Sequence, residues 1–273
     1  MLKLGKHSLD LSRPRVMGVL NRTPDSFSDG GRYAELEAAL RHAEALIREG
    51  ADILDVGGES TRPGSEAVGV QEELDRVIPV IERVGGLGAP VSVDTSKPEV
   101  MRAAVKAGAA MINDVYALRR PGAIEAAVAS GVGLCLMHMQ GEPRAMQKDP
   151  QYQDVTAEVG AFLKERAATA EMAGVPHDAI VLDPGFGFGK NLEHNLTLLR
   201  RLPELAALGY PLLVGLSRKS MIGALLGGKP VEERLYGSVA AAVIAVLNGA
   251  HIVRVHDVPA TVDALKLTAA MCG

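Results

Sequence analysis

Apolar residues in this chain gather in short runs, and polar residues stand where several of these runs end. Five runs end in side chains that an active site would use, at residues 91–95, 111–114, 180–185, 212–219 and 251–257. Each is followed by a helical pattern, and such alternation is typical of parallel strands buried on both faces. Ligands bind at the carboxyl ends of such strands. The placement of these polar residues therefore predicts a site.

The alternation predicts eight strand–helix units. Strands are expected at 16–20, 52–56, 90–93, 110–114, 133–137, 180–183, 212–216 and 251–255. Helices are expected at 34–49, 70–84, 98–106, 123–129, 154–173, 192–202, 231–247 and 258–270. In a chain of 273 residues, eight units predict an α/β fold, a (β/α)8 TIM barrel forming a single domain over residues 1–273. An open doubly wound sheet is the alternative, and the count of eight favours the barrel.

Composition and charge exclude several classes of protein. The chain has 29 Lys and Arg against 33 Asp and Glu, a net charge of −4, which argues against a nucleic-acid binder that works by bulk charge. Charges interrupt every apolar run, so no membrane span is expected. The first residues carry no apolar signal segment, which favours a cytoplasmic protein. Cys135 and Cys272 lack metal-ligand spacing, and Cys135 is expected to be a small buried hydrophobe.

Two connections after the first two predicted strands, at residues 21–31 and 57–64, are long, polar and rich in Pro and Gly. Loops of this kind on the catalytic face often act as lids over the site. The alternative is a merely solvated connection. We favour the lids, because Pro and Gly shape both loops where short turns would suffice.

Cationic and carboxylate residues both fall on the predicted catalytic face. The cations are Arg62, Lys219, Arg254 and His256, and together they suit an anionic ligand such as phosphate or carboxylate. Asp94, Asn113 and Asp183 stand deeper, at strand ends, where they could hydrogen-bond a flat, donor-rich heterocycle. The two aspartates could instead be acid–base catalysts or metal ligands, and spacing alone leaves this open.

The segment GFGFGK at residues 185–190 looks like a phosphate loop but lacks the P-loop pattern. We interpret it as a flexible turn that brings aromatic rings and Lys190 to the mouth of the barrel. His138 follows a strand and is expected to be a satisfied polar residue. No HExxH, CxxC or GxSxG motif is present, so a transition metal held entirely by the protein is not expected.

These segments together resemble one family, the dihydropteroate synthases. The resemblance rests on NRTPDSFSDGG at 21–31, DVGGESTRPG at 55–64, DPGFGFGK at 183–190, GLSRK at 215–219, RVHD at 254–257 and shorter blocks at 92–95, 112–115 and 137–141. It spans essentially the whole chain, with the blocks in the right order. The resemblance implies a (β/α)8 transferase that joins p-aminobenzoate to 7,8-dihydropterin pyrophosphate with Mg²⁺. It also implies small-molecule substrates only, a homodimer and sensitivity to sulfonamides, which mimic p-aminobenzoate.

The resemblance also implies roles for individual residues. The implied pterin ligands are Asp94, Asn113, Met137, Asp183, Gly215 and Lys219. The implied pyrophosphate ligands are Asn21, Arg62, Arg254 and His256, with Asn21 also near the metal. The implied p-aminobenzoate site comprises Thr61, Arg62, Pro63, Phe188, Ser217 and Lys219. The implied catalytic residues are Asp94, Lys219, Arg254 and His256.

Simple physical chemistry agrees with this reaction. Loss of pyrophosphate leaves a delocalised cation, which a buried carboxylate such as Asp94 would stabilise. The aniline nitrogen is already nucleophilic, so no catalytic triad is needed. Two rivals are a pterin-dependent methyltransferase barrel and a non-catalytic pterin-binding protein. The methyltransferase has no use for the 60–64 loop, the 217–219 segment and the Arg254–His256 pair, all of which are present. A protein that only binds a neutral pterin needs no cations for pyrophosphate.

Overall fold

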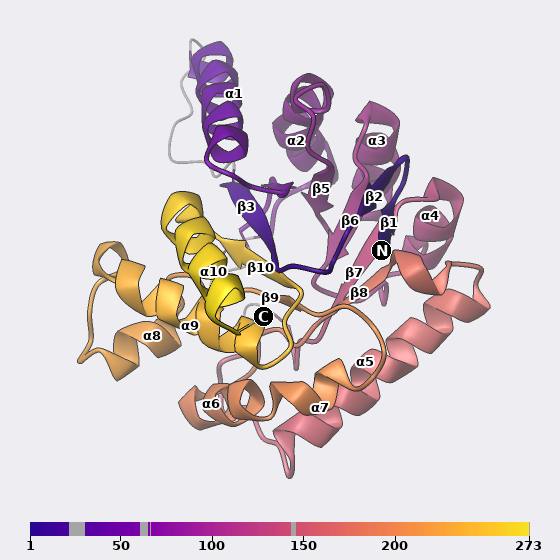
Figure 1. The fold of residues 1–273 in the computed structure, drawn as a ribbon. Coiled ribbons are helices and arrows are strands. Elements are labelled where there is room, and N and C mark those ends of the chain that lie inside the picture. Colours follow the sequence, from indigo (N-terminus) through magenta and orange to yellow (C-terminus); the bar gives the residue numbers. More distant parts are fainter. Residues whose placement is uncertain (22–30, 61–64, 66, 143–145, 273) are drawn as a thin grey trace.

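Eight parallel strands follow one another around a barrel in the computed structural model of the chain (Figure 1). The structure describes all residues except 22–30, 61–64, 66, 143–145 and 273. The strands pair in the order β8-β7-β6-β5-β4-β3-β10-β9. A parallel bridge between Leu182 and Leu212 joins the two ends of this order, and the backbone N–H of Leu182 donates to Pro211 O at 2.9 Å. This closure confirms the predicted (β/α)8 barrel and excludes the open sheet.

All eight predicted strands are present, with small shifts at their ends. They are β3 (Arg15–Asn21), β4 (Ile53–Gly57), β5 (Val91–Asp94), β6 (Met111–Asp114), β7 (Gly133–Met137), β8 (Ile180–Asp183), β9 (Leu213–Val214) and β10 (Ile252–Val255). Only β9 is much shorter than predicted. Its polar continuation, Gly215–Lys219, belongs to the site.

The helices lie outside the strands (Figure 1). They are α1 (Gly31–Arg48), α2 (Val70–Val84), α3 (Pro98–Ala107), α4 (Ala123–Ser130), α5 (Val155–Met172), α6 (Leu192–Arg200), α7 (Leu202–Ala206), α8 (Ser220–Leu225), α9 (Leu235–Leu247) and α10 (Val258–Cys272). The helix predicted at 192–202 ends at Arg200, because Pro203 cannot donate a backbone hydrogen bond within a continuing helix. The helix predicted at 231–247 starts at Leu235, after a 3-10 turn (Val231–Glu233), and α8 was not predicted. No helix in the described part of the chain has the length and apolarity to cross a membrane.

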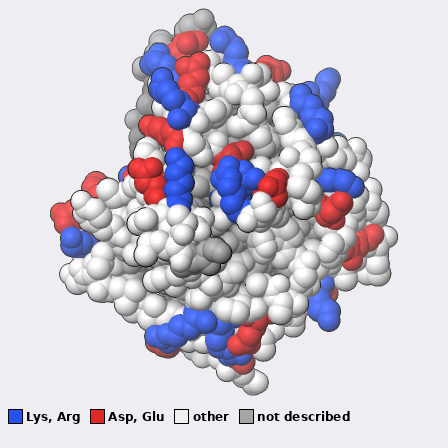
Figure 2. All heavy atoms as spheres, viewed as in Figure 1, with Lys and Arg blue, Asp and Glu red and all other residues white. Residues whose placement is uncertain are grey.

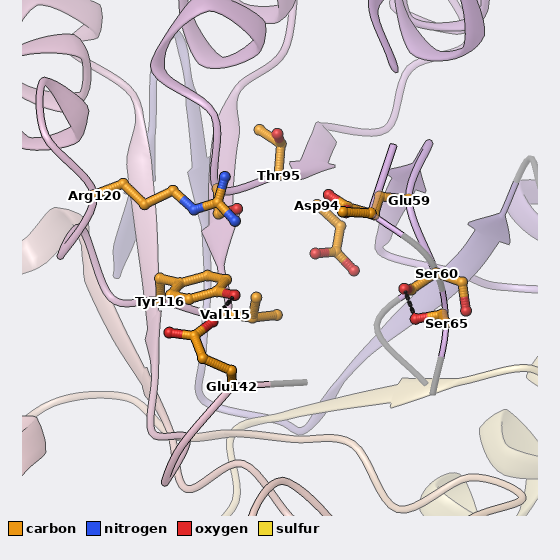
Figure 3. Close-up of a pocket in the computed structure, with 11 residues that line it drawn as sticks. Glu59, Ser60, Ser65, Asp94, Thr95, Val115, Tyr116, Arg120 and Glu142 are labelled. Carbon is orange, nitrogen blue, oxygen red and sulfur yellow. Dashed lines mark hydrogen bonds between the residues drawn. The ribbon is translucent and has the colours of Figure 1, made fainter. Parts of the chain in front are cut away.

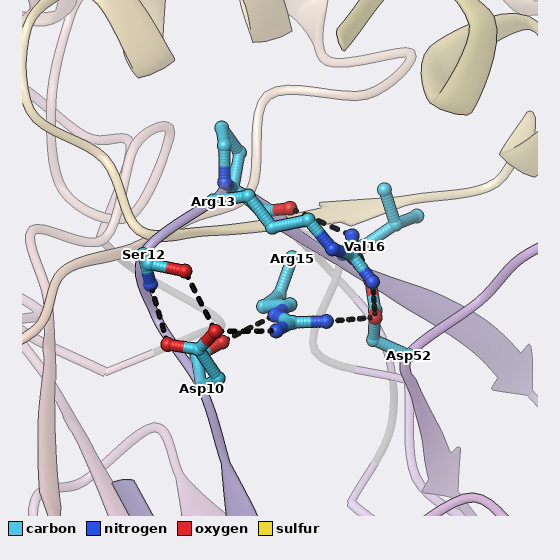
Figure 4. Close-up of polar contacts among 7 residues, drawn as sticks. Asp10, Ser12, Arg13, Arg15, Val16 and Asp52 are labelled. Carbon is cyan, nitrogen blue, oxygen red and sulfur yellow. Dashed lines mark hydrogen bonds and ion pairs between the residues drawn. The ribbon is translucent and has the colours of Figure 1, made fainter. Parts of the chain in front are cut away.

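A short antiparallel hairpin, β1 (Leu2–Leu4) and β2 (His7–Leu9), closes the amino end of the barrel. Leu2 and Leu4 are fully buried among side chains that point inward from the strands, including Met17, Ile53 and Cys135. The hairpin leads into β3 through a polar cluster (Figure 4). There Asp52 accepts from Arg13 at 2.7 Å and from Arg15 at 2.8 Å. The hairpin was not predicted, because three-residue strands carry no readable period. The expected burial of Cys135 is confirmed, while the side chain of Cys272 lies outside the described residues.

The interior of the barrel has two layers of different character. Residues two apart on a strand point to the same face. Ile53, Met111, Val181 and Ile252 form part of the apolar layer beneath, which the hairpin covers. Two residues further along, the same strands carry Asp55, Asn113, Asp183 and Arg254. The carboxyl end of the barrel therefore places buried polar groups directly above an apolar floor.

Candidate active site

Arg254 on β10 lies between two carboxylates at the centre of the polar layer. Its Nε donates to Asp55 Oδ2 at 2.6 Å, and its Nη2 donates to Asp94 Oδ2 at 3.0 Å. Asn113 Nδ2 donates to the same oxygen of Asp55 at 3.3 Å. One hydrogen-bonded network thus joins side chains from four strands, β10, β4, β5 and β6. These strands are close together in the barrel, with β3 between β10 and β4.

Burial sets the electrostatics of this network. Removal from water raises the pKa of the Asp94 carboxyl to about 8, Asp55 adds to the rise, and Arg254 opposes it. The two carboxylates raise the pKa of Arg254 above its ordinary value, so the guanidinium stays charged. Asp55 Oδ1 is buried and has no hydrogen-bond partner among the residues that the structure describes. Strongly shifted pKa values in a concave site are typical of functional groups.

Asp183 and Lys219 form the other side of the site. Asp183 Oδ1 accepts from the backbone N–H of Gly185 at 2.7 Å, and burial raises the pKa of its carboxyl. Burial lowers the pKa of Lys219 to about 8, while Asp183 opposes this shift. Lys219 Nζ donates to the carbonyl of Phe186 and lies 4.8 Å from the centre of the Phe188 ring. A Cβ on Gly215 would lie 4.0 Å from Lys219 Nζ, so this glycine borders the same space.

The 185–190 segment differs from its prediction in the position of its lysine. Lys190 is 2% exposed and does not reach the mouth. Its Nζ instead contacts His138 Nδ1 at 2.9 Å and donates to two carbonyls, those of Gly185 at 2.9 Å and Phe188 at 3.1 Å. The prediction that this turn brings Lys190 to the mouth was wrong, because the ammonium finds hydrogen-bond acceptors inside the protein. Of the two aromatic residues predicted to reach the mouth, Phe188 does border the site, while Phe186 is fully buried.

His256 and Ser217 meet just beyond the ends of β9 and β10. Ser217 Oγ lies 3.0 Å from His256 Nδ1 and accepts from the His256 backbone N–H at 3.2 Å. The neighbouring Arg218 binds Asp257 through Nε and Nη2, at 3.0 and 2.5 Å. Arg218 has a left-handed backbone, with φ of 59°. The two contacts fix the 217–219 segment against the segment that follows β10.

Apolar side chains border one edge of the polar layer. Met137 is buried with Val115, Met139 and Met146, and Phe188 packs against this group. Next to it opens a cavity of about 300 Å³ that reaches Asp94 (Figure 3). The side chains around the cavity include Thr95, Tyr116 and Glu142, and Tyr116 donates to Glu142 at 2.5 Å. A flat ring could therefore rest on apolar contacts while its edge meets Asp94.

The base of the 57–69 connection is tied down by a buried ionic cluster that sequence reasoning missed. Lys97 donates to Glu59 Oε2 at 2.5 Å and also to Glu73, a fully buried residue of α2. Glu59 Oε1 accepts from the Val68 backbone N–H at 3.1 Å, which links the two ends of the loop. Only the three-dimensional pairing reveals this cluster, although Glu59 falls within the segment that carried the family resemblance.

The structure brings together most of the predicted site residues. Those of the described chain that lie around the polar layer are Asp94, Asn113, Met137, Asp183, Phe188, Gly215, Ser217, Lys219, Arg254 and His256. Asn21 stands at the exposed end of β3. Thr61, Arg62 and Pro63 lie outside the described residues, as does most of the 21–31 loop. Asp55 was missed as a site residue, although it lies on the inward face two residues after Ile53.

Comparisons with known proteins show the family. A model of the family described as "Pterin binding enzyme" matches residues 17–256. Dihydropteroate synthase of Escherichia coli K12 is 57% identical over 264 residues, covering 96% of this chain and 93% of the relative. The chain belongs to the dihydropteroate synthase family of pterin-binding enzymes.

Solved structures give the same result for the fold. A Xanthomonas albilineans dihydropteroate synthase with 4-aminobenzoic acid superposes with a TM-score of 0.91 at 57% identity, covering 97% of this chain and 95% of that one. The enzyme from the same organism in complex with 7,8-dihydropteroate has a TM-score of 0.89 at 53% identity, covering 100% and 98%. The family resemblance drawn from the sequence motifs is confirmed.

Proposed function

We propose that this chain condenses 7,8-dihydropterin pyrophosphate with p-aminobenzoate to give 7,8-dihydropteroate and pyrophosphate. The observation that carries the proposal is the network of Arg254 between Asp55 and Asp94, facing the Asp183–Lys219 pair. Buried carboxylates and a cation are arranged there for one polar, donor-rich ring and an anionic leaving group. The family relatives are named for this activity, and one is solved with 7,8-dihydropteroate.

The pterin is held edge-on by the polar layer. Asp94 and Asp183 accept hydrogen bonds from its ring N–H and amino groups, Asn113 supplies a further amide, and Lys219 donates to an acceptor on the ring. Met137 and Gly215 border the same space. Donors on the pterin favour the ionised form of Asp94, so substrate binding lowers the raised pKa of that carboxyl.

The reaction exchanges one bond for another at the pterin methylene carbon. The carbon–oxygen bond to pyrophosphate breaks, and its electron pair leaves with the pyrophosphate. The amino nitrogen of p-aminobenzoate gives its lone pair to the carbon and then releases a proton to water. Ionised Asp94 stabilises the positive charge that spreads over the ring system in between, and it is effective because the buried carboxylate, 8% exposed, is little screened by solvent.

Arg254 and His256 stabilise the departing pyrophosphate. The two bonds from Arg254 to carboxylates use one hydrogen each on Nε and Nη2, and a guanidinium carries five N–H donors in all. His256 is oriented by Ser217 on its Nδ1 side, which directs Nε2 elsewhere. Arg62 joins this set by resemblance.

Mg²⁺ fits the end of β3 as a substrate-borne ion. A Cβ on Gly57 would lie 3.1 Å from Asn21 Oδ1 and 3.8 Å from Asp94 Oδ2, so this glycine leaves both oxygens facing a shared space. No cluster of three or more His, Cys, Asp or Glu suited to a metal occurs in the described residues. Magnesium is often held by only one or two protein oxygens together with substrate phosphates. When bound, it would neutralise charge on the pyrophosphate.

The p-aminobenzoate site lies beside Lys219. The Phe188 ring lies 4.8 Å from its ammonium, and Ser217 stands two residues before it in the chain. The ammonium suits the carboxylate of p-aminobenzoate or an edge of the pterin. Thr61, Arg62 and Pro63 complete the site by resemblance. A solved relative holding 4-aminobenzoic acid supports a site for this substrate. Sulfonamides are expected to compete with p-aminobenzoate at the same place.

The test is pyrophosphate release from purified protein with dihydropterin pyrophosphate and Mg²⁺, measured with and without p-aminobenzoate. We expect release that depends on p-aminobenzoate, with dihydropteroate formed in equal amount. Pterin binding without release would instead favour the non-catalytic protein or the methyltransferase. The next assay would then use methyl-folate with a corrinoid acceptor.

We also propose that two copies associate through the outer face of α8, α9 and α10. Exposed apolar side chains gather there, among them Leu226, Tyr236, Ile244 and Leu247, and Leu226 packs toward α9 at Gly237. The surface at the lower left of Figure 2, over α8 and α9, is mostly uncharged. Tyr236→Asp should convert a dimer to a monomer in analytical ultracentrifugation. Met172→Asp, at an equally exposed apolar side chain on α5, is the matched control and should leave the mass unchanged.

A further inference from the structure

A buried lysine that the mechanism does not use holds the β8–α6 loop together from inside. Lys190 Nζ has three partners within 3.1 Å, the carbonyls of Gly185 and Phe188 and the imidazole of His138. In the described part of the chain, no carboxylate lies within ion-pair distance of it. Burial lowers the pKa of Lys190 to about 7, and its ammonium form has three N–H donors, so this geometry uses each of them. The lysine thus acts as an internal crosslink between the two ends of one loop and a neighbouring strand end.

His138 is suited to accept this bond. It is 6% exposed and stands edge-on to the Phe162 ring, with centroids 4.9 Å apart. Burial and the adjacent Lys190 lower the pKa of the imidazole to about 2, so the ring is neutral and one nitrogen can accept. A protonated histidine at 2.9 Å from an ammonium would repel it.

The loop is fixed on its outer side as well. A Cβ on Gly185 or Gly189 would overlap backbone atoms of His138 or Gln140, so the loop is pressed against the connection that follows β7. Asn195 Oδ1 accepts from the Gly187 N–H at 2.7 Å, and Tyr152 donates to Gly189 O at 2.8 Å. Glycine is required at both close contacts, because each also has a positive φ, 67° and 61°.

The inner side of the loop meets Lys219. The carbonyl of Phe186 accepts from Lys219 Nζ, and the Phe188 ring lies 4.8 Å from the same atom. The carbonyl of Phe188 is one of the three partners of Lys190. Lys190 therefore binds the backbone of Phe188, the residue whose ring lies beside Lys219 at the p-aminobenzoate site.

We propose that Lys190 is a positioning residue that fixes Phe188 beside Lys219 and so determines the affinity for p-aminobenzoate. The inference rests on the proposed function, because it assigns a cause to the second-substrate site of that reaction. It separates the two substrates, because Asp183 lies on β8, where it pairs with Met137 of β7, whereas Phe188 stands in the loop whose carbonyls Lys190 binds.

The test is Lys190→Met, which keeps the length of the side chain and removes the three hydrogen bonds. We expect the KM for p-aminobenzoate to rise by roughly tenfold to a hundredfold, the effect of a displaced binding group. The KM for the pterin pyrophosphate and kcat should change by less than about threefold. Tyr152→Phe is the matched control: it removes one hydrogen bond to the same loop but leaves all three of Lys190, and it should leave both KM values unchanged.

A double-mutant cycle with Phe188→Ala distinguishes positioning from general destabilisation. If Lys190 acts through Phe188, then Lys190→Met should add little to the KM for p-aminobenzoate in the Phe188→Ala background. Equal increases in both KM values, or full additivity in the cycle, would overturn the proposal. If Lys190→Met does not fold, His138→Ala removes one of the three partners and must raise the KM for p-aminobenzoate selectively. The wild-type protein tests the proposed function independently. Pyrophosphate release that does not depend on p-aminobenzoate would refute the proposed reaction, whatever the variants show.

Discussion

The two ends of the barrel use the same strands for opposite purposes. At the amino end, Ile53 and Ile252 are buried in an apolar layer capped by the β1–β2 hairpin. Two residues later on the same strands, Asp55 is just as deeply buried and Arg254 is partly buried, and the two form an ion pair. An apolar layer stabilises by burial, whereas a buried carboxylate carries a desolvation cost. Stability is therefore concentrated at the amino end, while the carboxyl end is less stable because its buried polar groups are needed for binding and reaction.

Removal of the central guanidinium should have the largest effect on the carboxyl end of the barrel. Arg254→Ala should lower kcat/KM with the pyrophosphate substrate by roughly 10²–10³-fold, the usual effect of losing one group that stabilises developing negative charge. Binding of a bare pterin, measured by calorimetry, should fall far less, since Arg254 interacts with the leaving pyrophosphate and a bare pterin carries none. Arg201→Ala is a control, because Arg201 binds Asp154 and Glu204 on the outer surface. Equal losses in turnover and pterin binding would refute the role of Arg254.

A pH profile tests the charge on the opposite side of the site. Burial lowers the pKa of Lys219 to about 8, so its ammonium is present below that pH and is lost above it. The donor to the pterin disappears with the proton, and kcat/KM should fall by about tenfold per pH unit above about pH 8. Lys219→Arg keeps the charge and should remove this falling limb, although its overall rate will be lower. A wild-type profile that stays flat to about pH 10 would exclude Lys219 as the titrating group.

A smaller effect is expected on the free energy of unfolding, which the burial of Asp94 at the carboxyl end lowers. The folded Asp94 binds its proton more tightly than the unfolded one, because burial raises its pKa from 3.8 to about 8. The free energy of unfolding should therefore fall as the pH rises through this window. Asp94→Asn lacks the group, so it should keep the fold, lose pterin binding, and melt a few °C above the wild type near pH 8 but not near pH 4. A melting temperature below that of the wild type throughout would mean that the Asp94–Arg254 pair stabilises the fold.

The sequence predicted the repeating architecture and part of the site for physical reasons. A strand buried on both faces must be an apolar run, so the eight strands were visible, and polar residues such as Asp94 and Asp183 stood out where runs ended. The same logic fails for pairing across the barrel. Asp55 lies in a predicted strand, but nothing near it in the sequence indicates its partner Arg254, which is on another strand far along the chain. The direction of Lys190 depends on His138, 52 residues away. No local pattern encodes such contacts, and the short hairpin β1–β2 carries too few residues to show a period.

The most direct test that the two ends of the barrel serve different purposes compares one variant from each end. Ile53→Ala removes a fully buried side chain from the apolar layer, and Asp183→Asn keeps the shape and the oxygen that accepts from Gly185. The free energy of unfolding and kcat/KM should be measured for both. We predict that Ile53→Ala loses about 2–5 kcal/mol of stability with little change in kcat/KM. Asp183→Asn should lose most of its kcat/KM at nearly unchanged stability. The reverse pattern, or equal losses in both quantities for both variants, would contradict the account.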